Sequence, residues 1–295
     1  LQQLYNIVDT LIVGRFIGTG ALAAVGSAYT LMTFIISILL GMCMGSGAIF
    51  SIRFGEKRWD HLRENIFTSF VMIAFFSAVL NILSFVMIDA IMRFISVPDE
   101  VYGLMREYLL VVFCGIFASF LYNFFASLLR AVGNSMMPLV FLGVSAVLNI
   151  ALDLVFVLGF DMGVGGAALA TVISQWIAGA GMMFYTLVKC PELRPQRKDM
   201  KITAAGLGEI TGASVLTCLQ QSVMNLGILM VQGLVNSFGT AVMAAFAAAV
   251  KIDAFAYMPL QDFGNAFSTF TAQNYGARKE ERIRKGIRSA LCSML

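Results

Sequence analysis

The sequence is poor in charge, in histidine and in paired cysteines. Charged residues make up only 13% of the 295 residues, whereas soluble domains carry about 25%. A soluble fold of this length could not bury the 59% of residues that are hydrophobic, so a soluble domain is excluded. The single histidine, His61, stands in a polar segment, which argues against a histidine-based acid–base or metal centre. None of the five cysteines forms a CxxC pair, and we interpret them as small buried hydrophobic residues.

Long apolar runs recur along the chain. A hydrocarbon core of ~30 Å needs about 20 helical residues, and only helices or closed barrels satisfy their backbone groups in lipid. Strand-like alternation is missing, so we predict an all-α polytopic membrane protein. The predicted spans are 1–16, 21–52, 65–92, 103–128, 137–158, 165–187, 210–236 and 240–272, with a ninth that begins near 287.

Basic residues gather on one side of the predicted membrane. Sixteen of the 20 Lys and Arg residues follow spans two, four, six and eight, in groups of four, one, five and six. The positive-inside rule places these segments and the amino terminus in the cytoplasm. Topology and attraction to anionic lipid explain the basic clusters, so we expect no nucleic-acid partner.

Two segments repeat at one spacing. GTGALAAVGSA at 18–28 aligns with GTAVMAAFAAA at 239–249, and the same offset of 221 residues aligns IRFGEKR at 52–58 with QNYGARK at 273–279. One ungapped offset across a helix hairpin predicts two pseudo-symmetric six-helix lobes of the same orientation, related by an axis along the membrane normal. We expect a first lobe at 1–188, a cytoplasmic linker at 189–209, and a second lobe at 210–295 that is incomplete in this chain.

Polar residues inside the first lobe form stripes at helical spacing. An ionisable residue in a span is costly and marks a candidate functional site. Asp9 lies ~9 Å, and Asp153 and Thr171 ~12 Å, from the predicted outer ends of three spans, at a rise of 1.5 Å per residue. Two carboxylates at matched depth, without Lys or Arg in that half's membrane interior, predict a site for a proton or a metal cation. Taken singly, Ser, Thr and Asn can instead hold helices together. The stripes are Gln2, Asn6 and Asp9; Ser145, Asn149 and Asp153; Thr171, Ser174 and Gln175; and Ser119, Tyr122, Asn123 and Ser127.

The second lobe and the outer ends carry further polar candidates. Lys251 and Asp253 stand early in span eight, and Asp262 follows Pro259, where we expect a kink. Near the outer end of span three, Asp89 and Arg93 are four residues apart, and we predict an ion pair between them. The possible polar sites of the second lobe are Gln221, Asn225, Lys251, Asp253 and Asp262.

Several motifs in order resemble the multidrug and toxic compound extrusion (MATE) family of the polysaccharide-exporter and flippase superfamily. They are NIVDTLIVGRFIGTGALAAVG at 6–26, RFGEKR at 53–58, LLRAVGNSMMP at 128–138, LNIALDLVFVLGFDMGVGGAALATVISQ at 148–175 and QNYGARK at 273–279. The resemblance covers the whole chain and implies twelve helices in two lobes that alternate between open faces. It also implies a bacterial or archaeal cytoplasmic membrane, and a chain that lacks the start of helix one and roughly the last four helices.

The resemblance implies a place for the coupling ion. In members with a cation site in the first lobe, the family's residues on helices one, five and six correspond to Asp9, Asn149, Asp153 and Thr171. An Asn on helix four also belongs to that site, and Asn123 is the nearest candidate. Na⁺ could bind at Asp9 and Asp153. Some relatives have a carboxylate on helix seven for a second-lobe site, but span seven has none here, which puts that site in doubt.

We therefore predict a secondary active transporter, not an enzyme. It would export drugs or other amphipathic or cationic small molecules by alternating access, in exchange for H⁺ or Na⁺, as a monomer in the lipid bilayer without a cofactor. A flippase for lipid-linked precursors is the alternative. Such proteins tend to line their cavity with several cations, whereas Lys251 is the one cation placed inside a span here. An integral membrane enzyme is a weaker alternative, because the sequence lacks an acid–base or metal constellation.

Overall fold

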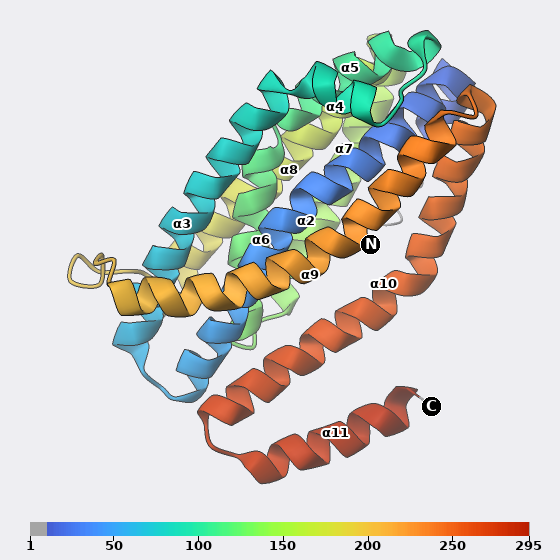
Figure 1. The fold of residues 1–295 in the computed structure, drawn as a ribbon. Helices are drawn as coiled ribbons and strands as arrows, with labels where there is room; N and C mark the ends of the chain where they lie inside the picture. Colours follow the sequence, from blue (N-terminus) through green and yellow to red (C-terminus); the bar gives the residue numbers. More distant parts are fainter. Residues whose placement is uncertain (1–10, 295) are drawn as a thin grey trace.

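Figure 1 shows the computed structural model, which describes residues 11–294 apart from the side chains of residues 205, 251, 254–256, 258, 293 and 294. These residues form helices and turns, without a strand. The long helices are α2 (Thr19–Gly55), α3 (Trp59–Val86), α5 (Asp99–Phe113), α6 (Ile116–Ala131), α7 (Met136–Asp153), α8 (Gly163–Lys189), α9 (Ala204–Asn236), α10 (Thr240–Gly276) and α11 (Glu280–Met294). The short elements are the π-helices η1 (Val13–Ile17) and η2 (Leu154–Gly159), α4 (Ile88–Phe94) and the 3₁₀-helix η3 (Pro191–Leu193).

The helices confirm the predicted all-α membrane fold. Five stretches of the described residues are long and apolar enough to cross a bilayer, and the bent pair α5–α6 makes a sixth. The boundaries of two predicted spans were wrong, because both are interrupted. Span three breaks at Met87, after which α4 follows, and span four breaks at Cys114 and Gly115 with a bend of 48°.

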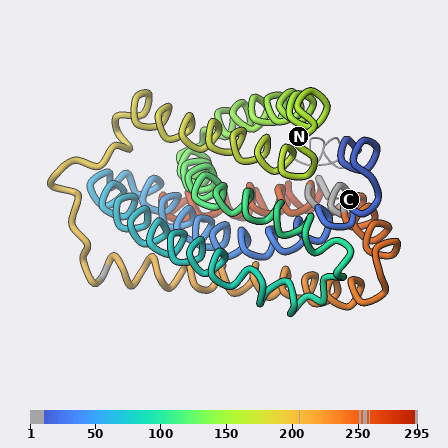
Figure 2. The backbone as a smooth tube through the Cα atoms, turned by 90° about the horizontal axis from the view of Figure 1, so that it is seen from above, coloured from blue at the N-terminus to red at the C-terminus, as the bar shows by residue number. Residues whose placement is uncertain are grey.

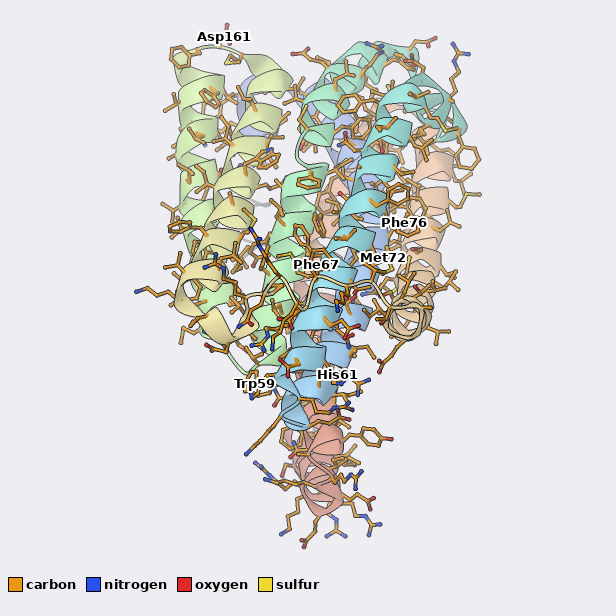
Figure 3. The ribbon with its side chains drawn as sticks, turned by 90° about the vertical axis from the view of Figure 1, so that its left-hand side faces the viewer. Trp59, His61, Phe67, Met72, Phe76 and Asp161 are labelled. Atoms are coloured by element: carbon orange, nitrogen blue, oxygen red, sulfur yellow. The ribbon has the colours of Figure 1, made fainter. Side chains whose placement is uncertain are left out.

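The charged turns lie at one end of the bundle. Figure 3 shows Trp59 and His61 at the start of α3, far from Asp161, which lies between η2 and α8 at the opposite end. The helix connections near Arg58, Arg130 and Arg278 and the segment from α8 to α9 share the end with Trp59. We call it the basic end; it is the end that the sequence assigns to the cytoplasm.

Helix α2 occupies the middle of the bundle. Seen from above, the α7–α8 hairpin lies along one side and α9 along the other, with α2 between them (Figure 2). A cluster of phenylalanine rings fills the space between α2, α3 and α6, with centroids 5.3–6.1 Å apart. Such rings bury large apolar areas and add favourable edge contacts. The cluster comprises Phe50, Phe70, Phe120, Phe124 and Phe125.

The two predicted repeats adopt the same local structure. Helices α2 and α10 both contain 37 residues, and both ends of α10 lie 221 residues after those of α2. Each helix follows a glycine with positive φ, 125° at Gly18 and 91° at Gly239, a conformation that suits glycine. The turns after the helices also match, with positive φ at Lys57 and Arg278.

The two copies meet through a reciprocal contact at the basic end. A methyl group at Gly55 would collide with the carbonyl oxygen of Gln273, and one at Gly276 would collide with that of Ile52. Residues 52 and 55 are the repeat mates of 273 and 276, so each copy presents the same two positions to the other. This is the pattern of a two-fold interface. Because α2 and α10 both run toward the basic end, the axis lies along the bundle, as predicted.

A second contact between repeat mates lies near the opposite end. A methyl group at Gly26 would collide with the Cβ of Ala247, its own repeat mate. Between the two contacts α10 contains Pro259, and Figure 1 shows it bend away from α2 and α9. Proline removes one backbone hydrogen bond and crowds the preceding turn, which favours such a bend.

Glycines of α2 allow this helix to pack closely against the backbone of α9. A methyl group at Gly45 would lie 2.6 Å from the carbonyl oxygen of Ala213, and one at Gly41 would lie 2.5 Å from the Cα of Cys218. The Oγ atoms of Ser46 and Ser214 are 3.2 Å apart across the same contact. Small residues of this kind let membrane helices approach closely.

A buried network of polar side chains joins α2 and α9 at the other end of their contact. The Asn236 amide donates to Ser27 Oγ at 3.1 Å and to the carbonyl oxygen of Ile95 at 2.7 Å. Asn236 Oδ1 accepts from the Gln232 amide at 2.7 Å, and Thr30 Oγ1 donates to Gln232 Oε1 at 3.1 Å. A satisfied network of neutral groups joins helices without burying charge.

Ion pairs hold the predicted linker at the basic end. Arg53 Nη2 of α2 lies 2.6 Å from both carboxylate oxygens of Glu209, and Arg63 Nε of α3 lies 2.9 Å from Asp199 Oδ2. Helix α9 already begins at Ala204, so the last part of the predicted linker is helical. The helix therefore includes Glu209, a carboxylate that lies just before the predicted start of span seven at 210. The division into lobes and linker stays a prediction.

The predicted ion pair between Asp89 and Arg93 was wrong. Asp89 instead accepts from Arg106 Nε at 3.0 Å and from the Tyr102 hydroxyl at 2.9 Å, both on α5. These two hydrogen bonds, that of Arg106 first, lower the pKa of the Asp89 carboxyl below its usual value. The interruption after Val86 turns α4 toward α5, a change of direction that helical spacing along one continuous span could not reveal.

Candidate functional site

Two of the predicted polar stripes face each other across α7 and α8. The Asn149 amide donates to Thr171 Oγ1 at 3.4 Å, and Ser145 Oγ donates to the carbonyl oxygen of Ser174 at 3.1 Å. Asn149 and Asp153 are buried, with 2% and 0% of their surface exposed. The i, i+4 spacing of Ser145, Asn149 and Asp153 thus puts all three on the buried face of α7, as the sequence predicts.

The helix widens directly after the buried carboxylate. Asp153 is the last residue of α7, and the π-helix η2 begins at Leu154. The first span has a similar feature, since η1 covers Val13–Ile17. π-helical turns are rare and occur often at functional sites. Asp9, the predicted partner of Asp153, lies four residues before η1 and outside the described residues.

Two oxygen atoms without a hydrogen-bond partner belong to Asn149 and to the neighbouring turn of α8. Among the described residues, Asn149 Oδ1 and Ser174 Oγ are buried and have no hydrogen-bond partner. A buried oxygen without a partner is costly unless something fills the position. An amide oxygen, a hydroxyl and a carboxylate are the oxygen ligands that a hard cation prefers. The arrangement can therefore hold a small cation, or a proton on the carboxylate, between α7 and α8.

The hydrogen bond of Asn123 stays within its own helix. The Asn123 amide donates to the carbonyl oxygen of Ser119 on its own helix, α6, at 2.8 Å. No hydrogen bond joins Asn123 to Asn149 or Thr171 within the described part of the chain. The bend in span four precedes α6, so the register of this helix could not be read from the sequence.

The second-lobe candidates whose side chains are described lie on α9 and α10 in different surroundings. Gln221 is buried and directs its amide to Met44 Sδ at 3.5 Å, while the Asn225 amide returns to the carbonyl oxygen of Gln221 at 2.9 Å. Asp253 and Asp262 are exposed on α10, and the side chain of Lys251 lies outside the described part. In the described chain, no group of three His, Cys, Asp or Glu residues is arranged to hold a metal ion.

Sequence reasoning missed the residues that stabilise the break in span four. The carbonyl oxygen of Phe113 accepts from the Asn81 amide of α3 at 2.6 Å, and that of Cys114 accepts from Trp176 Nε1 of α8 at 3.2 Å. A glycine at 115 and a tryptophan within an apolar helix were the available signals, and each alone is weak.

Comparison with known proteins decides the family. The family model described as MatE matches residues 1–155 and 213–295. The chain belongs to the MatE family. The match includes Asn149, Asp153 and both copies of the repeat, whereas Thr171 lies outside the matched residues.

Similar proteins are described as multidrug resistance proteins. The chain is 29% identical to the probable multidrug resistance protein YpnP of Bacillus subtilis (strain 168), over 96% of this chain and 63% of that protein. It is 24% identical to the probable multidrug resistance protein NorM of Thermotoga maritima, over 96% of this chain and 61% of that protein. The MatE chain thus spans less than two thirds of these relatives.

A solved structure shares the fold of this MatE chain. The structure of the MATE multidrug transporter DinF-BH superposes with a TM-score of 0.90 and 26% identity. The similarity covers 98% of this chain and 65% of the solved chain. The fold in Figure 1 is therefore that of a MATE transporter, a multi-pass membrane protein.

Proposed function

We propose that this chain is part of a cation-coupled transporter that exports drugs or other amphipathic or cationic small molecules. Coupling to H⁺ or Na⁺ would occur at Asn149, Asp153 and Thr171 in the first lobe, together with Asp9. The observation that carries the proposal is the part-buried hydrogen bond from Asn149 to Thr171, one helical turn before the buried carboxylate of Asp153.

Physical chemistry favours a mobile cation at this position. A buried carboxylate is costly unless a cation or proton compensates its charge. Helix α7 contains no Lys or Arg, and the one basic residue of α8, Lys189, is the last residue of that helix. An exchangeable H⁺ or Na⁺ would contribute to this compensation, and the Asn149 amide oxygen, which is buried without a hydrogen-bond partner, would supply a further ligand.

The repeat supports alternating access. The two copies touch at Gly55 and Gly276 at the basic end, where a side chain on either glycine would clash. Two similar halves that meet across a two-fold axis can rock about a central site. We propose that the basic end faces the cytoplasm of a bacterium or archaeon, with the amino terminus on the same side, and that the transporter acts as a monomer.

The names of relatives suggest the class of substrate. YpnP and NorM are described as probable multidrug resistance proteins, and DinF-BH is described as a multidrug transporter. A family of exporters gives no support to the enzyme alternative. The flippase alternative gains no support from α7 and α8, whose one basic residue is Lys189 at the end of α8, whereas such proteins tend to line their cavity with several cations.

Dye export from vesicles tests the function. The full-length protein in everted vesicles should accumulate ethidium or rhodamine 6G when an excess of H⁺ or of Na⁺ is imposed separately inside the vesicles, and one of the two ions should drive it. Vesicles with an equal amount of the Asp153→Asn variant are the control. If the dye accumulates equally with the H⁺ gradient, with the Na⁺ gradient and with neither, cation coupling is contradicted.

A further inference from the structure

The fourth membrane span is broken in a way that exposes two backbone carbonyls. Helix α5 ends at Phe113 and α6 begins at Ile116, and their axes differ by 48°. The N–H groups of Cys114 and Gly115 donate three residues back, to Val111 and Val112. In the described backbone, the carbonyl oxygens of Phe113 and Cys114 accept no hydrogen bond from the N–H group four residues after each of them, as they would in a continuous α-helix. In lipid such carbonyls require another donor.

Side chains from two neighbouring helices supply the donors. The Asn81 amide of α3 donates to the Phe113 carbonyl oxygen at 2.6 Å, and Trp176 Nε1 of α8 donates to the Cys114 carbonyl oxygen at 3.2 Å. The break is therefore a built feature with a donor for each exposed carbonyl. Broken helices occur in transporters where the surrounding protein satisfies their backbone groups or where they line a water-filled cavity.

The same turn of α8 connects the break to the proposed cation site. Trp176 follows Thr171 by five residues, and Gln175 follows it by four, one helical turn. Gln175 Oε1 lies so near Gly115 that a methyl group there would be 2.5 Å from it. Thr171 contacts Asn149 at one end of this turn, and Gln175 and Trp176 contact the break at the other.

We propose that Trp176 and Gln175 are positioning residues that link cation occupancy at Asn149, Asp153 and Thr171 to the angle between α5 and α6. This inference rests on the proposed function. A cation held between α7 and α8 would draw Thr171 toward Asn149, and the rigid turn of α8 would carry this shift to the carbonyl of Cys114. Packed elements transmit such small shifts because they have discrete arrangements.

Fluorescence of Trp176 tests the link directly. The chain has two tryptophans, and Trp59 lies at the basic end against Phe54. In the full-length protein with Trp176 as the only tryptophan, Trp59 and any others being replaced by Phe, addition of the coupling ion should shift the Trp176 emission. The shift should be absent in the same protein with Asp153→Asn. An emission that does not respond to the ion, in a protein whose transport requires Asp153, would overturn the inference while leaving the proposed function intact.

Variants of the two donors distinguish coupling from simple support. Trp176→Phe keeps a ring against Phe117, whose centroid is 6.2 Å away, but removes the donor. We expect dye export to fall about twofold to tenfold, the factor expected for one lost hydrogen bond, while the dissociation constant of the cation changes less than about twofold. Trp176→Gln restores a donor and should recover part of the export.

The matched control removes the other donor. Asn81→Leu weakens the same break from α3, which carries none of the proposed cation ligands, so export should fall but the response of Trp176 emission to the ion should remain. Loss of that response in Asn81→Leu, or normal export by Trp176→Phe, would overturn the inference. Normal export by Asp153→Asn would overturn both the inference and the proposed function.

Discussion

The close contact between α2 and α9 predicts that Gly45→Ala destabilises the protein. The new methyl group would lie 2.6 Å from the carbonyl oxygen of Ala213, 2.6 Å from the Cα of Ser214 and 2.7 Å from the carbonyl carbon of Ala213. Carbon contacts are optimal at about 3.5–4 Å, and backbone atoms cannot rotate away, so the helices must separate by about 1 Å.

The magnitude follows from three terms. Overpacking of this kind costs about 1–3 kcal/mol. Lengthening the contact between Ser46 and Ser214, now 3.2 Å, removes about 0.5–1.5 kcal/mol. Replacement of glycine by alanine within a helix returns about 1 kcal/mol. We expect the free energy of unfolding to fall by about 0.5–3.5 kcal/mol. Each kcal/mol lowers the melting temperature by about 2–4 °C in a chain of this size.

Gly212→Ala is the matched control for Gly45→Ala. Gly212 lies in α9, and a methyl group there would have no neighbour within 4 Å. Its melting temperature should equal or slightly exceed that of the wild type, since only helix propensity changes. Scanning fluorimetry of both purified variants in detergent measures the difference. If Gly45→Ala melts at or above the temperature of Gly212→Ala, the packing of α2 against α9 is not as described.

Three further predictions concern charge and the cation site. Arg53→Gln and Glu209→Gln should each lower the free energy of unfolding, measured by chemical denaturation, by about 0.5–1 kcal/mol. The double variant in which the two charges are exchanged should recover part of this loss. A double variant no more stable than the single variants would contradict the ion pair between Arg53 and Glu209. The lowered pKa of Asp89 stabilises the fold above the usual carboxyl pKa of about 4, and this stability is lost as the pH falls through the lowered value. The difference in melting temperature between wild type and Asp89→Asn should therefore shrink below pH of about 4, and a difference that grows there would contradict the assignment. Asn149→Ala and Thr171→Ala should weaken the cation dependence of dye export less than loss of a carboxylate does, because each removes one neutral ligand; complete loss of coupling in either would contradict these roles.

The helices and the repeat could be predicted from the sequence because their signals are local. Apolar runs of the right length mark the spans, and Gly18 and Gly239 mark the same helix start in each copy. The contact of Asn149 with Thr171 was also predictable, since each lies in a polar stripe of fixed helical spacing. Each of these features is specified mainly by residues that lie close together in the sequence.

The rest depends on contacts between distant segments. The break at Gly115 looks like part of one apolar run, and its stabilising donors, Asn81 and Trp176, stand on other helices. The register of α6, and with it the place of Asn123, follows from that bend. Asp89 likewise finds Arg106 instead of Arg93, because a helix interruption reorients it. Helical periodicity gives each stripe but not the angle between the helices that carry them.

Competition between cation and substrate tests the central claim most directly. If Asp153 and Asn149 hold the coupling ion, the apparent dissociation constant of rhodamine 6G for the purified full-length protein should rise as the concentration of the coupling ion, H⁺ or Na⁺, is raised. Linkage requires that the substrate weaken cation binding by the same factor. In Asp153→Asn, at equal abundance and with an unchanged melting temperature, dye binding should no longer depend on the ion. An unchanged ion dependence in Asp153→Asn would contradict the account.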